Sequence, residues 1–328
     1  MMRTSVKARR HPLARRRLVL AACAFLGLPA VAQVTETRIR PSEQVGPGGK
    51  PIQVNVQLAL VNVTVTDSYD RLVTGLDKDN FHVFEDGVPQ EIVSFSSEDV
   101  PISIGIVFDM SGSMSDKLDK ARQAALQFLR TANPHDEFFL VSLNDQAELT
   151  SHFTSSIEEL QNQMMFTKAK GETALLDGIY LGLSQMRLAR NGRRALLIIS
   201  DGGDNHSRYS ESDIRNFVKE ADCQLYSIGV FDANDMGRTL EEQYGPTLLS
   251  EIAQLSGGRV FPVASPYDLP DIAAKIGTEL RNQYVLGYKP SDARHDGAWR
   301  KIKIKLSPPR GLPPLSVFAK TGYRAPSQ

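Results

Sequence analysis

Cysteine is almost absent from this sequence, and its absence limits how the fold can be stabilised. The 328 residues contain two cysteines, Cys23 and Cys223, and the first lies in a segment that we expect to be cleaved off. A lone remaining thiol cannot form a disulfide within the chain, which excludes a disulfide scaffold. We expect Cys223 to be a buried, inert thiol, because it opens an apolar strand pattern. Stability must therefore come from a hydrophobic core, for which 41% apolar residues suffice.

An apolar run long enough to cross a membrane is also missing. The longest run, LVLAACAFLGLPAVA at residues 18–32, is shorter than the about 18–20 residues that a spanning helix needs. It follows seven Lys/Arg and ends in a small-x-small site at Ala32, the pattern of a secretory signal peptide. We expect residues 1–32 to be this signal and the protein to be exported, to the periplasm or the cell exterior. Two alternatives would attach the protein to the membrane: an uncleaved signal anchor and lipidation at Cys23.

The chain has no excess of positive charge once the expected signal peptide is removed. The whole chain has 38 basic and 38 acidic residues, but residues 1–32 hold seven of the basic ones and no acid. The remaining chain therefore carries a formal charge of about −7. Because nucleic acids bind to basic surfaces, this balance argues against a nucleic-acid partner.

Strand patterns occupy the two segments on either side of the central part. Residues 33–50 are polar and rich in glycine and proline, which predicts a flexible linker. Residues 51–98 form an N-terminal β segment in which β-branched and polar residues alternate, with a hairpin at Asp86–Gly87. Residues 284–328 form a C-terminal β segment with three further strand patterns. Because each segment is too small to fold alone, we expect the two to pack together as one small all-β accessory module.

The central part, residues 99–283, has a different pattern. Short buried strands alternate with amphipathic helical stretches, which is typical of an α/β fold with a doubly wound, mostly parallel sheet. The strand patterns are ISIGIVFD, EFFLVSLN, ALLIISD and QLYSIGVF. The apolar residues of two helical stretches fall on single stripes, namely Leu118, Ala121, Ala125 and Phe128, then Leu175, Ile179, Leu183 and Met186. We expect both helices to lie on the sheet.

Three oxygen-bearing side chains follow the first of these strands at alternate positions. Asp109 ends the strand, and Ser111 and Ser113 come directly after it. Ligands of open parallel sheets bind beyond the carboxyl ends of the strands, where the strand order reverses, and Asp109 falls at that place. Gly112 allows the loop to turn tightly before the next helix, at about Asp116.

Two further oxygen donors occur later in the chain in matching contexts. Thr173 lies in a loop just before a helical stretch, and Asp201 ends the strand ALLIISD. Hydroxyl and carboxylate oxygens with no histidine or cysteine nearby suit Mg²⁺, Mn²⁺ or Ca²⁺ and not zinc. Asp204, three residues after Asp201, could orient water or the loop around such an ion.

The order D-x-S-x-S, then Thr, then Asp resembles the metal-ion-dependent adhesion site of the von Willebrand factor type A domain. The resemblance covers about residues 99–280 and implies a Rossmann-like domain with a divalent cation, Mg²⁺ foremost. The flanking segments LVTGLDKDNFHVFEDGVPQEIVSFS and GYKP…WRKIKIKL…GY are similar to secreted bacterial proteins related to that family.

The resemblance also implies a role for each residue of the site. Ser111, Ser113 and Thr173 would be direct or near-direct ligands, while Asp109 and Asp201 would hold the ion, often through water. Gly112 and Asp204, which the residue pattern and not the resemblance singles out, are expected to shape the loops around it. An acidic residue of a protein partner would complete the coordination. Two carboxylates neutralise a divalent ion and the hydroxyls add no charge, so an open position keeps its affinity for an anionic oxygen.

We therefore expect a non-enzymatic, metal-dependent protein-binding module. One alternative is a structural component of an envelope assembly whose metal only stiffens the loops. Another is a Mg²⁺-dependent phosphoryl hydrolase, since aspartates at strand ends also serve that chemistry. A hydrolase with an aspartyl nucleophile would need a second acid at the position of Ser111, and the sequence has no P-loop and no G-x-S-x-G motif.

Overall fold

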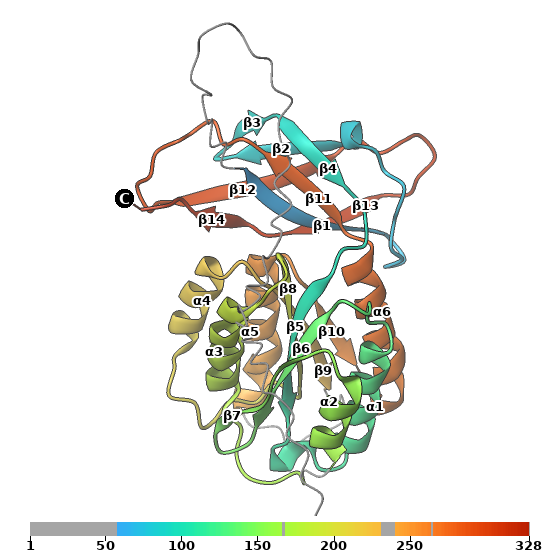
Figure 1. Ribbon diagram of the computed structural model, residues 1–328, viewed down its shortest axis with the longest axis vertical. Coiled ribbons are helices and arrows are strands. Elements are labelled where there is room, and N and C mark those ends of the chain that lie inside the picture. The colour runs from blue at the N-terminus through green and yellow to red at the C-terminus, as the bar shows by residue number, and fades with distance from the viewer. Residues whose placement is uncertain (1–57, 166–167, 231–239, 264, 328) are drawn as a thin grey trace, which may run out of the picture. The chain divides into compact units, whose positions relative to one another are not determined.

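A computed structural model describes residues 58–165, 168–230, 240–263 and 265–327 (Figure 1). All of them belong to one unit of the chain, Asn55–Gln328. The expected signal peptide, residues 1–32, and the expected linker, residues 33–50, lie outside the described residues. Within the described ranges, every helix is too short or too polar to cross a bilayer.

A central sheet of six strands has the order β10-β9-β8-β5-β6-β7. Its strands are β5 (Ile102–Asp109), β6 (Glu137–Leu143), β7 (Ala147–Thr154), β8 (Arg193–Ser200), β9 (Gln224–Val230) and β10 (Val260–Val263). All neighbours pair in parallel except β6 and β7, which are antiparallel. Because later strands add on both sides of β5, the strand order reverses there. The expected doubly wound, mostly parallel α/β fold is confirmed.

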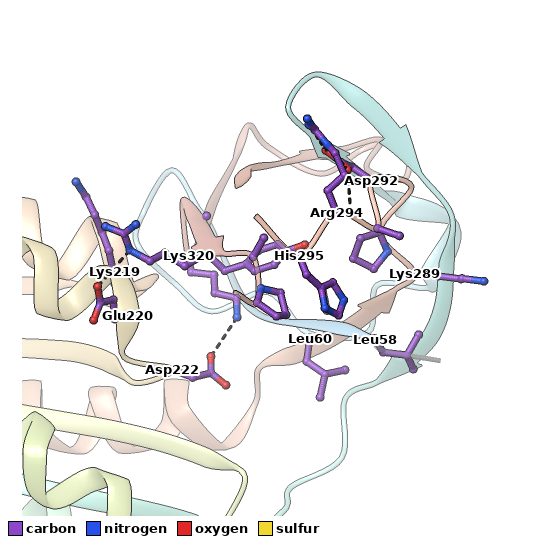
Figure 2. Close-up of a pocket in the computed structure, with 18 of the residues that line it drawn as sticks. Leu58, Leu60, Lys219, Glu220, Asp222, Lys289, Asp292, Arg294, His295 and Lys320 are labelled. Atoms are coloured by element: carbon purple, nitrogen blue, oxygen red, sulfur yellow. Dashed lines mark hydrogen bonds and ion pairs between the residues drawn. The ribbon is translucent and has the colours of Figure 1, made fainter. Parts of the chain in front are cut away.

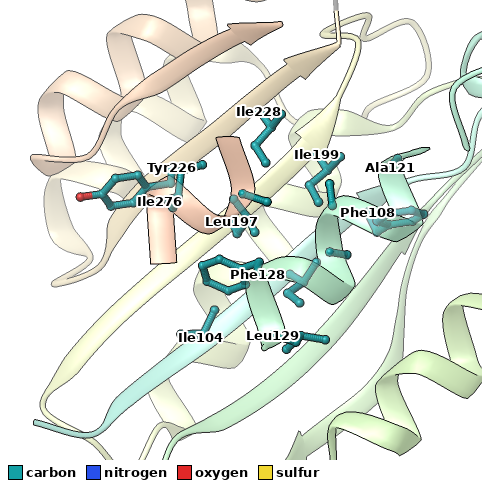
Figure 3. Close-up of a cluster of buried hydrophobic side chains, with 14 of the residues drawn as sticks. Ile104, Phe108, Ala121, Phe128, Leu129, Leu197, Ile199, Tyr226, Ile228 and Ile276 are labelled. Carbon is teal, nitrogen blue, oxygen red and sulfur yellow. The ribbon is translucent and has the colours of Figure 1, made fainter. Parts of the chain in front are cut away.

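Helices cover both faces of the central sheet. One face packs against α1 (Leu118–Leu129), α2 (Ile157–Met165) and α6 (Leu269–Arg281), and the other against α3 (Leu175–Gln185), α4 (Glu211–Glu220) and α5 (Leu240–Ser256). Figure 3 shows part of the first layer, where Phe128 of α1 lies among Ile104, Leu197 and Ile276. Every residue of the two predicted apolar stripes is buried. Burial of each large apolar side chain contributes about 1.5–3 kcal/mol, so this packing positions the helices.

Two further sheets form a sandwich, which we call the β module (Figure 1). One contains β1 (Ala59–Asp67), β4 (Ile92–Ser96), β11 (Tyr284–Tyr288) and β13 (Leu315–Ala319). The other contains β2 (Phe81–Glu85), β3 (Val88–Gln90), β12 (Trp299–Leu306) and β14 (Gly322–Arg324). The N-terminal strand β1 pairs with the C-terminal strands β11 and β13, which confirms an accessory module built from both segments.

The predicted hairpin of the β module is also present. Strands β2 and β3 are joined by Asp86 and Gly87, whose φ angles are 48° and 86°. Positive φ at both central residues is what a two-residue hairpin turn of this hand requires, and glycine adopts it without strain. The apolar faces of the two sheets meet in one core that includes Val63, Tyr288 and Ile302.

A buried polar junction joins the β module to the α/β domain. Gln283 lies between α6 and β11, and its Nε2 donates to Thr64 Oγ1 of β1 (3.0 Å) and to the Tyr226 hydroxyl of β9 (3.1 Å). Arg193 Nη2 donates to Gln283 Oε1 over 2.9 Å. Because the side chains of Gln283, Thr64 and Tyr226 are fully buried, these bonds fix the junction without competition from water.

Candidate metal centre

Asp109 ends β5 at the carboxyl edge of the sheet and is fully buried. Its Oδ1 accepts from the Ser111 amide (2.9 Å), and its Oδ2 accepts from the Ser200 hydroxyl (2.6 Å). Burial raises the pKa of Asp109 to about 6, and the nearby charge of Asp201 adds to the effect. The carboxylate is thus held in one orientation, in surroundings where a cation would lower the cost of its charge.

Ser111 and Ser113 lie beside each other at the start of a short 3₁₀ turn, Gly112–Met114. Their hydroxyl oxygens are 3.0 Å apart, with Ser111 buried and Ser113 exposed. The Gly112 amide donates to the Gly171 carbonyl (2.9 Å), and a Cβ at Gly112 would come within 3.3 Å of that oxygen. The absence of a side chain at Gly112 therefore lets the two loops approach closely.

Thr173 lies just before α3, and contacts with the loop after β8 hold it at the same edge. Its amide donates to Asn205 Oδ1 over 2.9 Å. Its carbonyl accepts from the amides of Asn205 (3.1 Å) and His206 (3.2 Å). Thr173 is 4% exposed, so its position is set by these contacts with Asn205 and His206 and not by solvent.

Asp201 directly follows β8, and only one of its two carboxylate oxygens has a partner among the described residues. Its Oδ2 is 3.5 Å from Lys117 Nζ, at the start of α1. Its Oδ1 is buried and has no hydrogen-bond partner among the described residues. An unpaired buried carboxylate oxygen costs more than about 1–3 kcal/mol, and a bound cation would remove that cost. The donor set therefore fits a hard divalent ion.

Asp204 has hydrogen bonds to the N-terminus of α3. Its Oδ1 accepts from the Leu176 amide (3.2 Å) and from the Ser207 hydroxyl. Burial raises its pKa. Asp204 thus links the loop after β8 to α3, the helix that follows Thr173.

Sequence reasoning did not identify three neighbours of the site: Lys117, Ser200 and Asn205. Ser200 had one signal, since it is the polar residue that ends the apolar strand ALLIIS. Lys117 and Asn205 act through contacts between distant loops, which sequence spacing does not reveal. In the described part of the chain, no three His, Cys, Asp or Glu residues form a metal-binding group, so an ion here would depend on the hydroxyls.

Residues 104–203, which contain Asp109, Ser111, Ser113, Thr173 and Asp201, match the family model of the von Willebrand factor type A domain. Inter-alpha-trypsin inhibitor heavy chain H3 of Pongo abelii is 28% identical over 146 residues, which cover 40% of this chain and 17% of that protein. An uncharacterized protein of Borreliella burgdorferi is 21% identical over 212 residues, covering 57% of this chain and 62% of that protein. The matches thus span less than two thirds of both relatives.

Among solved structures, a similar one is von Willebrand factor type A from Catenulispora acidiphila. It is 12% identical in sequence and has a TM-score of 0.49. The superposition covers 82% of this chain and 75% of that chain.

Proposed function

The chain contains a von Willebrand factor type A domain, and from this premise we propose that it is a metal-dependent protein-binding module of an exported protein. The residues that would hold the ion, Mg²⁺ foremost, are Asp109, Ser111, Ser113, Thr173 and Asp201. The observation that carries the proposal is the buried, unpaired Oδ1 of Asp201 at the carboxyl edge of the sheet.

The charge of the site supports a role in binding an anionic oxygen. Asp109 and Asp201 supply two negative charges, which match one divalent cation, and the three hydroxyls add none. Ser113 and Gly112 are exposed, so the site opens to solvent on their side. When bound, the ion would supply attraction for a carboxylate of a partner protein, while this chain's residues hold and orient it.

The same residues argue against hydrolysis. The position two residues after Asp109, where an aspartyl-phosphate hydrolase needs an acid, is occupied by Ser111. Asp109 itself is fully buried and hydrogen-bonded to Ser200, which keeps it from reaching a substrate. We infer that the domain is not an enzyme.

The first test compares Ser113→Ala with Ser115→Ala in the full chain. Both serines are exposed and only two residues apart, so neither change should unfold the protein. Isothermal titration with Mg²⁺ and Mn²⁺ should give binding by the wild type and by Ser115→Ala, and affinity lowered at least tenfold in Ser113→Ala. Equal affinities in all three proteins would contradict the assigned site.

The second test captures partners from envelope and secreted proteins, with Mg²⁺ or with EDTA, and with Ser113→Ala in parallel. A protein retained by the wild type with Mg²⁺ and lost in both other arms supports a metal-bridged partner. Metal binding in the titration combined with capture that ignores EDTA would contradict the binding role, and would assign the ion to loop stability alone.

A further inference from the structure

A cavity of about 840 Å³ lies between the β module and the C-terminal end of α4 (Figure 2). Residues from four places line it: Leu58–Leu60 at the start of β1, 219–222 at the end of α4, six of the residues 289–295 after β11, and six of the residues 320–326 around β14. Helix α4 begins next to the loop of Asp201 and ends at this cavity, so the cavity is separate from the metal centre. Its volume is within the range of about 300–1,000 Å³ that is usual for ligand sites.

The first half of β1 has an open hydrogen-bonding edge in this cavity. On one side, β1 pairs with β11 from Ala59 to Val63. On the other side, β13 pairs only with Val63–Asp67, and after Ala319 the chain turns to α5, where the Thr321 amide donates to Leu255. Among the described strands, none pairs with Ala59–Asn62 on that side. A free edge of this kind is a template for an added strand.

The wall of the cavity next to that edge is apolar. Leu58 is 41% exposed and Leu60 is 51% exposed, whereas Val61 between Leu60 and Asn62 is buried in the sandwich core. Successive side chains of a strand point to opposite faces, so Leu58 and Leu60 share the outer face. Pro290, Ala293 and Pro326 add further apolar surface to the cavity.

The rim of the cavity is cationic. Five basic side chains line it together with three carboxylates: Lys219, Lys289, Arg294, Lys320 and Arg324, and Glu220, Asp222 and Asp292. Each of the three carboxylates forms an ion pair with a basic residue of the rim, namely Lys320–Asp222, Arg324–Glu220 and Arg294–Asp292.

Two cations of the rim are left over. Lys219 lies over the Trp299 ring, and within the described residues neither Lys219 nor Lys289 has a carboxylate partner. The rim thus has positive charge in excess on a protein whose expected mature chain is acidic.

We propose that this cavity binds an extended acidic peptide segment of a partner protein. The segment would pair its backbone with the open edge of β1, pack alternate apolar side chains on Leu58 and Leu60, and place its carboxylates near the excess positive charge to which Lys219 and Lys289 contribute. Backbone pairing then supplies affinity and the alternate side chains supply specificity. The open edge favours a peptide over a small amphipathic anion, which could fill the cavity without using that edge.

The proposal is tested with the full chain and blocked hexapeptides, followed by fluorescence anisotropy in EDTA. EDTA prevents the peptide carboxylates from binding through a metal ion, so the result is independent of the proposed metal function. The probe is (Glu-Val)₃, and its comparators are (Lys-Val)₃ and an acidic peptide whose central valine is proline. The acidic probe should bind at least tenfold more tightly than both, because the first comparator reverses the charge and the second cannot pair.

Variants then locate the binding. Lys219→Glu combined with Lys289→Glu should weaken the acidic probe at least tenfold. Lys301→Glu combined with Lys303→Glu makes the same charge change on the exposed face of β12 and should alter affinity less than twofold. Hydrogen exchange of residues 58–62 should slow when the probe binds. Three outcomes would each overturn the proposal. The first is equal affinity in both double variants, and the second is slow exchange of 58–62 before any peptide is added. The third is binding of dodecanoate, a small amphipathic anion, without binding of the probe.

Discussion

At the scale of single residues, Lys117 has a direct bearing on the proposed metal centre. Its ammonium group lies 3.5 Å from Asp201 Oδ2 and its side chain is 19% exposed. A cation at this place partly neutralises Asp201 and repels a divalent ion. We expect Lys117→Met to raise the affinity for Mg²⁺ by about threefold to tenfold at low ionic strength, as measured by isothermal titration.

The control for this change is Lys120→Met, on the same helix. Lys120 lies over the Tyr267 ring and forms no ion pair with the site. Its loss should leave the affinity for Mg²⁺ within twofold of the wild type. If Lys117→Met also leaves it there, the ion pair with Asp201 does not influence the site.

Asp177, on α3, stabilises the loop that carries Asp201 and Asp204. Its carboxylate accepts from the amides of Arg208 (2.8 Å) and Tyr209 (3.1 Å) and from Arg208 Nε (3.0 Å). Burial raises the pKa of Asp177, but these bonds outweigh burial, so its pKa lies below the ordinary value of 3.8. The charged form is therefore favoured in the folded state.

We expect Asp177→Asn to lower the free energy of unfolding at pH 7 by about 1–3 kcal/mol, as measured by urea denaturation. A lowered folded pKa means that this stabilisation is complete above pH 3.8 and is lost as pH falls through the folded pKa. The difference from the wild type should therefore shrink in that acidic window. Asp119→Asn, at an exposed position, should change stability by less than about 0.5 kcal/mol. A difference that is the same at pH 7 and pH 3 would refute the role of the charge.

The order and contexts of Asp109, Ser111, Ser113, Thr173 and Asp201 could be read from the sequence, because each follows a strand or precedes a helix. Their metal-binding role stays a prediction. The contacts that hold these side chains in place could not be predicted from the sequence. The bond from Ser200 to Asp109 depends on how β8 and β5 pair, and the contact of Lys117 with Asp201 depends on where α1 begins.

At the scale of elements, the packing of α5 against the loop after β8 leaves no room at Gly245. A Cβ there would be 1.7 Å from the carbonyl oxygen of Gly202, the residue after Asp201. Because the clash is with backbone, Gly245→Ala has to move either α5 or the loop. We expect a loss of about 1–3 kcal/mol in the free energy of unfolding and a weaker affinity for Mg²⁺.

Urea denaturation and metal titration measure the two effects of this change. Gly192→Ala is the matched control, because a Cβ at Gly192 would meet nothing within 4 Å. It should alter neither quantity. Wild-type stability in Gly245→Ala would show that α5 can shift without cost, against the packing described above.

The helices with clear apolar stripes, α1 and α3, could be predicted, whereas α2, α4, β7 and β10 were not. Helix α4 is only ten residues long and has three apolar residues, Ile214, Phe217 and Val218, so its apolar stripe is shorter than those of α1 and α3. Strand β7 is an edge strand whose one buried residue is Ser151, so it lacks the apolar run of the inner strands. Tertiary contacts, and not local pattern, determine such elements.

At the scale of the whole described unit, the junction at Gln283 couples the β module to the α/β domain. Replacement by alanine would leave Thr64 Oγ1 and the Tyr226 hydroxyl without this donor and would open a buried gap. We expect Gln283→Ala to lower the free energy of unfolding by about 2–4 kcal/mol. We also expect its unfolding to separate into two transitions.

Scanning calorimetry measures both effects. For the wild type, the calorimetric and van't Hoff enthalpies should agree, because the two parts unfold together. Asn282→Ala, at the neighbouring exposed position, should retain a single transition. A single transition at unchanged temperature in Gln283→Ala would mean that the junction does not transmit stability.

The discontinuous β module was predictable from the sequence because two short strand-rich segments, each too small to fold alone, flank the α/β pattern. The pairing partners were not predictable. The placement of β1 between β11 and β13 follows from which apolar faces meet in the core, with Val61, Val63 and Leu286 among them. The open half of β1 is a consequence of that register.

This arrangement also determines how the protein responds to mechanical load. The α/β domain is inserted between β4 and β11, so the chain enters and leaves it through neighbouring strands of one sheet. Tension applied before β1 and after β14 is carried first by the ladders of β1 with β11 and β13 and by the ladder of β14 with β12. The α/β domain lies off that path, so we expect its carboxyl edge to keep its geometry until the sandwich yields.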